Sequence, residues 1–268
     1  MLSSKNLKAE PILISIITVV YNGEKYLENA ILSVAAQTGV QFEYVIVDGG
    51  STDGTSEIIK KYEACIDKWI SEPDEGIYDA MNKGIRMAAG QVIGILNADD
   101  ELNPGVLEKV AAEFKRSKDL DYLYGYVERM TTSGTVYDIA DSLHPEQMDK
   151  RKYNQIPIPH GALFVKKQMF EELGYYKTSY VINSDYDFIL RLINQNKKGI
   201  RLDLAISRYR DGGKSSGYRT FWERRKLLKE EGVPLLKREF VVFRAMTKLL
   251  IAKLLPARLV ASMRKRSK

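Results

Sequence analysis

Cysteine and histidine are scarce in this chain of 268 residues, which contains one cysteine and two histidines. A single cysteine, Cys65, excludes an internal disulfide and removes any sign of an oxidising compartment. With only His144 and His160 beside it, a zinc site built from cysteine and histidine ligands is not expected. Any metal site in this protein would therefore have to be built from other side chains.

Long apolar runs are also missing. No stretch of about 18 uninterrupted apolar residues occurs, so no transmembrane helix is expected. The first eleven residues lack the apolar core of a signal peptide, so export is not indicated. A hydrophobic content of 44% and a charged content of 28% are ordinary for a soluble globular protein, and we expect a cytoplasmic location.

The body of the chain lacks a net positive charge, which is confined to its end. From Lys237 onward the net charge is +9, which leaves −3 for residues 1–236 out of a total of +6. This distribution argues against a nucleic-acid-binding core and favours a tail that meets an anionic surface.

The first part of the chain alternates between short apolar runs and segments with apolar residues at helical spacing. Strands are predicted at 12–20, 42–47, 66–70 and 92–96, with helices at 24–37, 55–62 and 76–88. This alternation predicts an α/β fold with a mostly parallel central sheet and helices on both faces.

The pattern is less regular after residue 120. Strands are predicted at 122–127, 135–139, 162–165 and 200–207, helices at 167–173 and 185–194, and a loop with at most one short helix at 141–159. We interpret residues 1–217 as the main domain, with halves at 1–125 and 126–217. Residues 218–268 form a basic, helical C-terminal tail.

Acidic and amide side chains follow the predicted strand at 92–96. Asn97, Asp99 and Asp100 would lie at the carboxyl end of this strand, where ligands of open α/β sheets gather. Clustered carboxylates suit a hard cation such as Mg²⁺ or Mn²⁺, which can also bridge to phosphates. The alternative is a polar turn that ends the strand and begins a helix.

Three more loops should reach the same edge of the sheet. The first follows Thr18 and contains Tyr21 and Asn22, the second is 48–54 and begins with Asp48, and the third is 72–84. Asp48 can accept hydrogen bonds from a base or ribose, whereas Asp53 can equally cap the following helix. Neither a P-loop nor a dinucleotide-binding glycine motif is present to explain this edge.

Four segments in this order resemble the family-two glycosyltransferases of bacterial polysaccharide biosynthesis. They are Ser15-Ile-Ile-Thr-Val-Val-Tyr-Asn22, Val47-Asp-Gly-Gly-Ser-Thr-Asp-Gly-Thr55, Glu72–Gly84 and Leu96-Asn-Ala-Asp-Asp100. The resemblance covers roughly residues 12–210. It implies a Rossmann-like glycosyltransferase A-type fold, a nucleotide-diphosphate sugar donor, a divalent metal and inversion at the anomeric carbon.

The resemblance also assigns roles to individual positions. Thr18, Tyr21, Asn22 and Asp48 match nucleotide contacts, and Asp74 and Asn82 match residues of the third loop near the donor. Asp99 matches the metal-binding carboxylate, and Asp100 lies next to the donor sugar. Asn97 departs from the Asp-x-Asp form, so it can contact ribose or a metal-bound water but contributes no charge.

The acceptor side should supply the catalytic base. The family places its general base at the position of Asp185, in Ser184-Asp-Tyr-Asp187. A capping box formed by Ser184 and Asp187 is the alternative explanation for this motif, but it leaves Asp185 unused. A carboxylate about 3 Å from an acceptor hydroxyl can take its proton during attack.

Three further residues are candidates for the acceptor side or a lid. His160 precedes a strand that the family places close to the acceptor, although a lone histidine is more often structural. Lys214, in the Gly/Ser loop 211–217, or Arg210 can meet a phosphate, although a plain solvent loop explains this segment equally well.

We therefore predict transfer of a sugar, with UDP as the expected carrier, to a saccharide or lipid-linked saccharide. The tail can lie on an anionic membrane, which would place the enzyme on the inner face of the cytoplasmic membrane, or pack on the main domain. The alternative functions are a nucleotidyltransferase that makes the nucleotide sugar and a non-catalytic nucleotide-sugar-binding protein.

Overall fold

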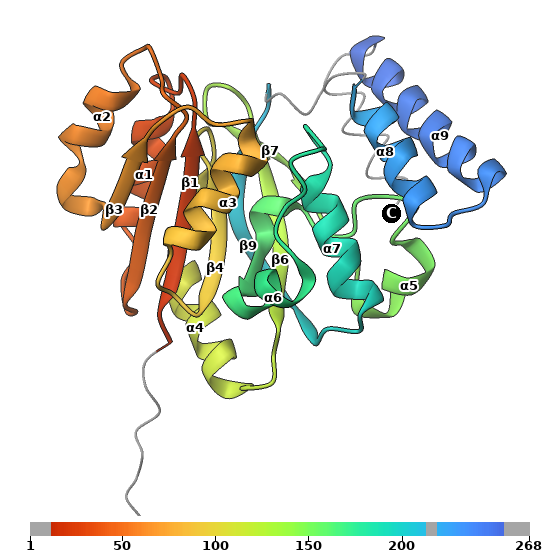
Figure 1. The fold of residues 1–268 in the computed structure, drawn as a ribbon, viewed down its shortest axis with the longest axis horizontal. Helices are drawn as coiled ribbons and strands as arrows, with labels where there is room; N and C mark the ends of the chain where they lie inside the picture. Colours follow the sequence, from red (N-terminus) through yellow and green to blue (C-terminus); the bar gives the residue numbers. More distant parts are fainter. Residues whose placement is uncertain (1–11, 213–218, 255–268) are drawn as a thin grey trace, which may run out of the picture.

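The computed structural model describes residues 12–212 and 219–254 (Figure 1). Its strands are β1 (Ile14–Val20), β2 (Phe42–Asp48), β3 (Lys68–Ser71), β4 (Val92–Asn97), β5 (Glu101–Leu102), β6 (Tyr122–Met130), β7 (Val136–Ala140), β8 (Leu163–Lys166) and β9 (Gly199–Arg210). Its helices are α1 (Leu27–Ala35), α2 (Thr55–Lys61), α3 (Ile77–Met87), α4 (Val106–Arg116), α5 (Met148–Arg151), α6 (Lys167–Leu173), α7 (Ser184–Asn194), α8 (Arg219–Glu230) and α9 (Leu235–Leu254).

The strands of the described chain form one sheet in the order β3-β2-β1-β4-β8-β6-β9-β5, with β7 paired to β6. Strands β1, β2, β3 and β4 pair in parallel, while β8 runs antiparallel to both β4 and β6. Because β9 pairs in parallel with β6, six strands run in one direction and β5, β7 and β8 run against them. The predicted mostly parallel sheet is confirmed.

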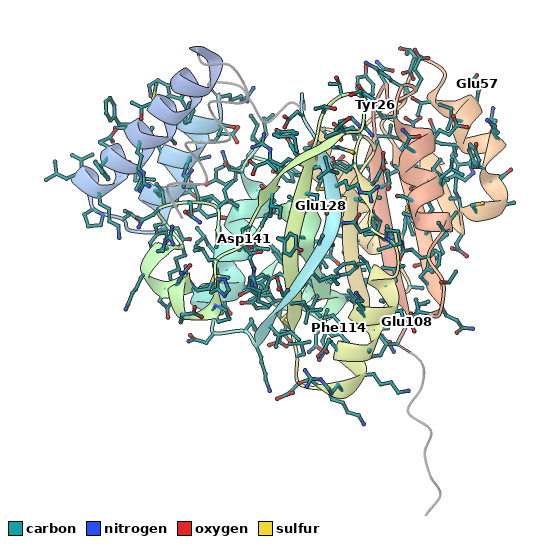
Figure 2. All side chains as sticks on the ribbon, turned by 180° about the vertical axis from the view of Figure 1, so that it is seen from behind. Tyr26, Glu57, Glu108, Phe114, Glu128 and Asp141 are labelled. Atoms are coloured by element: carbon teal, nitrogen blue, oxygen red, sulfur yellow. The ribbon has the colours of Figure 1, made fainter. Side chains whose placement is uncertain are left out.

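Helices cover both faces of this sheet, as the sequence predicts. On one face α3, α6 and α7 pack against side chains such as Ile17, Val45 and Val165. On the other face α1 and α4 pack against Ile16 and Tyr44 (Figure 2). A central strand such as β1 is thus buried on both sides, which explains its unbroken apolar sequence.

The second half contains most of the differences from the sequence prediction. Segment 141–159 holds a 3-10 turn (Pro145–Gln147) that continues into the short α5, in agreement with a loop carrying one short helix. Strands β6 and β9 run three residues further than predicted, because each supplies the other with backbone partners to Met130 and Arg210. The two-residue β5 pairs with β9 and had no periodic signal. Residue 125, the predicted boundary between the halves, lies within β6.

Helices α8 and α9 lie together beside α7 (Figure 1). Leu227 of α8 packs with Tyr180, Tyr186 and Leu190, and Leu228 packs with Val241 of α9. The basic end of the tail, from residue 255, lies outside the described residues. Among the helices that the structure describes, none has the length and apolar character needed to cross a membrane.

Candidate active site

Four loops meet at one edge of the sheet because the four strands that precede them are parallel and in register. Val20 of β1 lies beside Asp48 of β2, which in turn lies beside Ser71 of β3. On the other side of β1, Val19 is paired with Asn97 of β4. The carboxyl ends of these strands therefore present the predicted loops together, at the position where open α/β sheets bind ligands.

Asn22 joins the first loop to the second. Its backbone has φ of 52°, a left-handed conformation that asparagine tolerates better than most residues. Its side-chain oxygen accepts a hydrogen bond from the Thr52 backbone amide at 2.9 Å, and the backbone amide of Asn22 donates to the Ser51 hydroxyl at 2.8 Å. Neighbouring Tyr21 is 54% exposed at this edge.

Asp48 is fully buried at the end of β2. Its carboxylate accepts hydrogen bonds from the Ser51 amide and hydroxyl and, at 2.5 Å, from the Ser71 hydroxyl. These bonds fix the second loop against β3. A nucleotide contact through the Asp48 carboxylate would require one of these serines to release it.

Thr18 lies deeper in the sheet than the other predicted donor residues. Its side chain is fully buried, and its hydroxyl accepts a hydrogen bond from the Tyr44 hydroxyl at 3.0 Å. The structure therefore brings Tyr21, Asn22 and Asp48 to the loop edge but leaves Thr18 within the core.

The third loop approaches the second through a glycine. Asp74 accepts a hydrogen bond from the Gly76 amide at 2.8 Å, and its other carboxylate oxygen lies against Gly49. A β-carbon at position 49 would stand 2.3 Å from that oxygen, so only glycine allows this approach. Asp74 thus lies at the loop edge, next to the segment that begins with Asp48.

Asn82 is buried inside the molecule rather than at the edge. Its side-chain amide donates to the Tyr176 carbonyl at 2.8 Å, and its oxygen accepts from the Tyr176 amide at 3.0 Å. Both ends of the side chain are therefore used to attach α3 to the segment before α7.

The fourth loop places Asp99 and Asp100 in different surroundings. Asp100 is buried; one of its oxygens accepts from the Arg210 amide at 2.9 Å and the other from the Asn97 side chain at 3.0 Å. Burial, together with the charge of Asp99, raises the pKa of Asp100 to about 7. Burial also raises the pKa of Asp99, an effect that the Arg210 charge opposes.

We tested whether these residues fit a divalent cation. Within the described residues, no group of three or more histidine, cysteine, aspartate or glutamate side chains is arranged to hold a metal ion. Asp100 already accepts two hydrogen bonds, whereas the carboxylate of Asp99 forms no ion pair with another described residue. A divalent cation here would have one carboxylate ligand from the protein, that of Asp99, and would need substrate phosphates and water for its other ligands.

Asp185 lies in the first turn of α7 and is partly exposed. The Tyr78 hydroxyl of α3 lies 2.8 Å from its Oδ1 and also contacts the Ile182 carbonyl. Burial and the nearby Asp185 hold the pKa of Tyr78 well above its usual range, so its hydroxyl remains a donor. Tyr78 thus links the third loop to the candidate base.

The capping-box interpretation of Ser184 and Asp187 is wrong. The residue before α7 is Asn183, and no side chain caps the helix from that position. Asp187 instead forms ion pairs with Lys177 at 2.7 Å and with Arg191 at 2.9 Å. Asp185, by contrast, forms no ion pair with the described residues.

His160 lies close to Asp185 in the second half of the molecule. Its Nε2 is 3.3 Å from the Tyr176 hydroxyl. Burial lowers the pKa of His160, and the charge of Asp185 partly offsets this effect. A neutral imidazole beside the candidate base can accept or donate a hydrogen bond, as contact with an acceptor sugar would require.

The expected lid residues separate into two cases. Lys214 lies outside the described residues. The guanidinium of Arg210 is buried and engaged within the protein: it donates to the Asp99 carbonyl at 3.0 Å and to Glu101 at 2.7 Å. Its role, which the sequence did not indicate, is to hold the fourth loop against β9.

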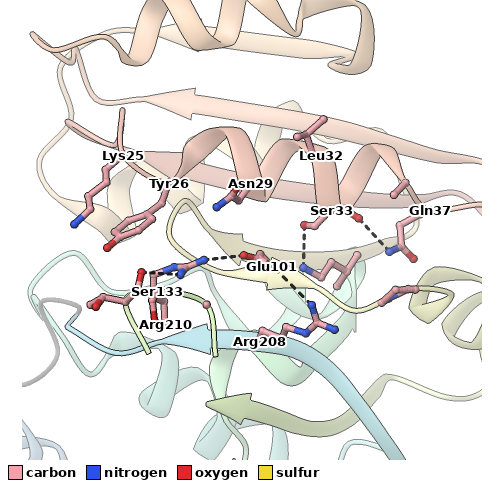
Figure 3. Close-up of a pocket in the computed structure, with 15 residues that line it drawn as sticks. Lys25, Tyr26, Asn29, Leu32, Ser33, Gln37, Glu101, Ser133, Arg208 and Arg210 are labelled. Carbon is pink, nitrogen blue, oxygen red and sulfur yellow. Dashed lines mark hydrogen bonds and ion pairs between the residues drawn. The ribbon is translucent and has the colours of Figure 1, made fainter. Parts of the chain in front are cut away.

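An open cavity of about 530 Å³ lies behind the fourth loop, between α1 and β9 (Figure 3). Glu101, Arg210 and Tyr26 line it, and the Arg210 guanidinium lies 4.6 Å from the centre of the Tyr26 ring. Apart from Arg210, none of the described residues predicted for the donor or acceptor site lines this cavity. Volume alone therefore does not locate the candidate site, which is an exposed edge.

Comparison with known proteins identifies the family. The sequence model described as "Glycosyl transferase family 2" matches residues 15–174. This chain belongs to glycosyltransferase family 2. The matched region contains all four loops of the edge and His160, whereas Asp185 lies beyond it.

Similar proteins include a glycosyltransferase named for PGL/p-HBAD biosynthesis in Mycobacterium bovis. It is 31% identical over 207 residues, which are 74% of this chain and 77% of the relative. An uncharacterised glycosyltransferase of Methanocaldococcus jannaschii is 29% identical over 208 residues, 74% of this chain and 70% of the relative. The family-2 glycosyltransferase is therefore aligned over most of its length with proteins of the same activity class.

Among solved structures, S. aureus TarS residues 1–349 in complex with UDP-GlcNAc is similar to this chain. The TM-score is 0.68 with 19% identity, and the match covers 86% of this chain and 70% of that one. At this identity the likeness shows the fold, which is the glycosyltransferase A type that the resemblance implied.

Proposed function

We propose that this family-2 glycosyltransferase transfers a sugar from a UDP-linked donor to a saccharide or lipid-linked saccharide, with inversion. The observation that carries this proposal is the arrangement of four interlocked loops at the carboxyl edge of β1–β4, with Asp185 attached to the third loop through Tyr78. The edge supplies groups for a nucleotide diphosphate, and Asp185 supplies a base.

The donor part of the proposal is supported by three features of the edge. Tyr21 is exposed there, Asp74 lies beside Gly49, and the Ser51 amide and hydroxyl order the second loop around Asp48 at the end of β2. UDP is the nucleotide we favour, because TarS, which shares the fold, has been solved with UDP-GlcNAc.

The part of the proposal that concerns a metal rests on Asp99. This carboxylate would hold Mg²⁺ or Mn²⁺ jointly with the diphosphate, and the cation would neutralise the charge of the leaving group. Asn97 supports the same loop by donating to Asp100, so that Asp100 accepts hydrogen bonds and Asp99 remains for the cation. In this proposal Asp99 is the metal ligand and Asp100 orders the loop around it.

The part of the proposal that concerns the acceptor rests on Asp185. Its carboxylate would take the proton of the acceptor hydroxyl as that oxygen attacks the anomeric carbon. A single displacement with one base inverts the configuration at that carbon. His160, near Asp185, would contact the acceptor sugar.

A lipid-linked acceptor would bring the enzyme to a membrane, and the surface of α8 and α9 suits such contact. Trp222, Leu236, Phe240 and Phe243 are between 64% and 86% exposed. Exposed apolar side chains beside basic residues favour an anionic lipid surface. Co-sedimentation with anionic but not neutral vesicles, reduced by Trp222→Ala with Phe240→Ser, is expected; equal recovery with both vesicles would refute this contact.

Titration calorimetry with UDP, GDP and dTDP, with and without Mn²⁺, tests the donor assignment. We expect Mn²⁺-dependent binding of UDP that Asp99→Ala abolishes. Asp149→Ala, which removes an 89% exposed carboxylate, is the matched control and should bind like the wild type. Folded wild-type protein that binds none of the three nucleotides would refute the donor site.

UDP release from UDP-GlcNAc then separates an enzyme from a binding protein. We expect slow, Mn²⁺-dependent hydrolysis that Asp185→Asn reduces while UDP affinity stays the same. Binding of UDP without any release of UDP from the sugar nucleotide would favour a non-catalytic binding protein.

A further inference from the structure

Helix α8 contacts the segment directly before α7 through one carboxylate. Glu223 accepts hydrogen bonds from three consecutive backbone amides, those of Val181 at 3.0 Å, Ile182 at 2.9 Å and Asn183 at 3.3 Å. Its side chain is only 11% exposed, so these bonds are largely shielded from water. Charge-assisted bonds of this kind are stronger than those between neutral groups.

These bonds hold the segment that leads into α7, and only the last of them, from the Asn183 amide, satisfies a group at the helix N-terminus. The first amides of a helix lack partners within it, and Asn183, the residue before α7, caps none of them with its side chain. That side chain turns to α8 instead and donates to the Thr220 carbonyl at 3.1 Å. The beginning of α7 is therefore held by α8, and the negative charge of Glu223 near a helix N-terminus adds a favourable interaction with the helix dipole.

The held segment continues directly to Asp185. The Ile182 carbonyl and the Asp185 carboxylate both accept from the Tyr78 hydroxyl. That hydroxyl has one hydrogen, so it can serve only one of the two acceptors at a time. The position of the Ile182 carbonyl therefore decides how far the Tyr78 hydroxyl can donate to Asp185, and Glu223 fixes that position.

We propose that Glu223 is a positioning residue for Asp185, so that α8 belongs to the catalytic unit rather than to a separate tail. The inference rests on the proposed role of Asp185 as the base. Glu223 keeps residues 181–183 in place, which fixes the Ile182 carbonyl that shares the Tyr78 hydroxyl with Asp185 and thereby sets the orientation of the Asp185 carboxylate.

A second glutamate offers a matched control. Glu231, just after α8, accepts from Asn194 at the opposite end of α7 at 2.6 Å and from the Tyr153 hydroxyl at 3.3 Å. It joins the same two helices but lies at the far end from Asp185. A loss that reflects only weakened helix packing should therefore be the same for Glu231→Gln as for Glu223→Gln.

The experiment measures UDP release from UDP-GlcNAc by the full chain. We expect kcat to fall about tenfold in Glu223→Gln and about a hundredfold in Glu223→Ala, because small displacements of a catalytic group cost this much. Glutamine keeps one acceptor oxygen, which explains its smaller effect. The KM for UDP-GlcNAc and the affinity for UDP should stay within about twofold of the wild type, and Glu231→Gln should retain its kcat.

Two further measurements separate positioning from general stability. Hydrogen exchange of the amides of residues 181–186 should accelerate in Glu223→Ala and not in Glu231→Gln. In an Asp185→Asn background, Glu223→Gln should have no additional effect on kcat, since the group that it positions is absent.

The outcomes are distinguishable. Faster exchange with unchanged kcat, unchanged exchange, or an equal loss in Glu231→Gln would each overturn the role of Glu223. A wild-type chain that binds UDP but shows no UDP release would count against the proposed reaction itself and would remove the base that Glu223 positions. Faster exchange in Glu223→Ala would then leave only its role as an anchor for residues 181–183.

Discussion

Replacing Asn82 tests whether this residue supports the fold or contacts the donor. The family resemblance places it near the sugar nucleotide, whereas the structure buries it and uses both ends of its side chain on the backbone of Tyr176. If the structural role dominates, Asn82→Ala should lower the free energy of unfolding and leave the affinity for UDP unchanged in the protein that remains folded.

The expected loss follows from the two hydrogen bonds. Asn82→Ala leaves the buried amide and carbonyl of Tyr176 without partners, at roughly 1–3 kcal/mol for each unsatisfied group. Because the surroundings relax in part, we expect a total of about 2–4 kcal/mol. Asn29→Ala, at an exposed position on α1, should change stability by less than about 0.5 kcal/mol.

Asn82→Asp adds a pH dependence whose sign is fixed by the geometry. A protonated carboxyl can donate to the Tyr176 carbonyl and accept from its amide, as asparagine does. An ionised carboxylate cannot donate, so burial and the facing carbonyl raise the folded pKa above the unfolded value of about 3.9. Stability is therefore retained below about pH 4 and lost above it, by about 1.4 kcal/mol per pH unit until the folded pKa is reached.

Urea unfolding of the wild type, Asn82→Ala and Asn82→Asp between pH 4 and 8 measures these effects. The difference between the two variants should favour Asn82→Asp at pH 4 and shrink or reverse at pH 7. A loss below about 1 kcal/mol in Asn82→Ala, or a difference between the variants that does not depend on pH, would refute the assigned contacts. A loss of UDP affinity in Asn82→Ala without a loss of stability would instead indicate that Asn82 contacts the donor.

Two further predictions concern the fourth loop and the acceptor side. Asn97→Asp removes the hydrogen-bond donor to Asp100 and places a second negative charge beside it. In thermal unfolding without metal, this variant should be less stable than the wild type by roughly 1–3 kcal/mol, and added Mn²⁺ should recover part of the loss. Unchanged stability without metal would contradict the contact between Asn97 and Asp100. Burial lowers the pKa of His160 below its unfolded value of about 6.5, so stability should be complete above pH 6.5 and fall below it. In urea unfolding, His160→Gln should reduce this loss of stability below pH 6.5, whereas His144→Gln, at an exposed position, should not. The same dependence of stability on pH in both variants would refute the assignment of the loss to His160.

Local sequence was sufficient to predict the first half of the fold. The apolar runs that became β1, β2 and β4 are buried on both faces, and the helical spacing of α1 and α3 matches the faces they bury. Patterns of this kind depend on neighbours in the chain, so they can be read directly. Strand β5 could not be found in this way, since its two residues are ordered by pairing with β9, more than 100 residues away.

The chemical types at the site were also encoded locally, in the polar residues that follow each strand. What the sequence could not indicate is which of those side chains would be used by the protein itself. Asp48 is occupied by Ser51 and Ser71, Asp100 by Arg210 and Asn97, while Asp99 is not paired in this way. Whether a carboxylate is bonded within the protein depends on contacts between distant segments, and the periodicity of the sequence does not show these contacts.

The sequence by itself thus determined the family, the alternation of strands and helices, and the loops that carry acidic side chains. Tertiary structure alone decided that Asn82 binds backbone, that Arg210 supports the fourth loop, and that Glu223 reaches the beginning of α7. The physical reason is that buried polar groups must find partners, and those partners are set by packing between segments far apart in the chain.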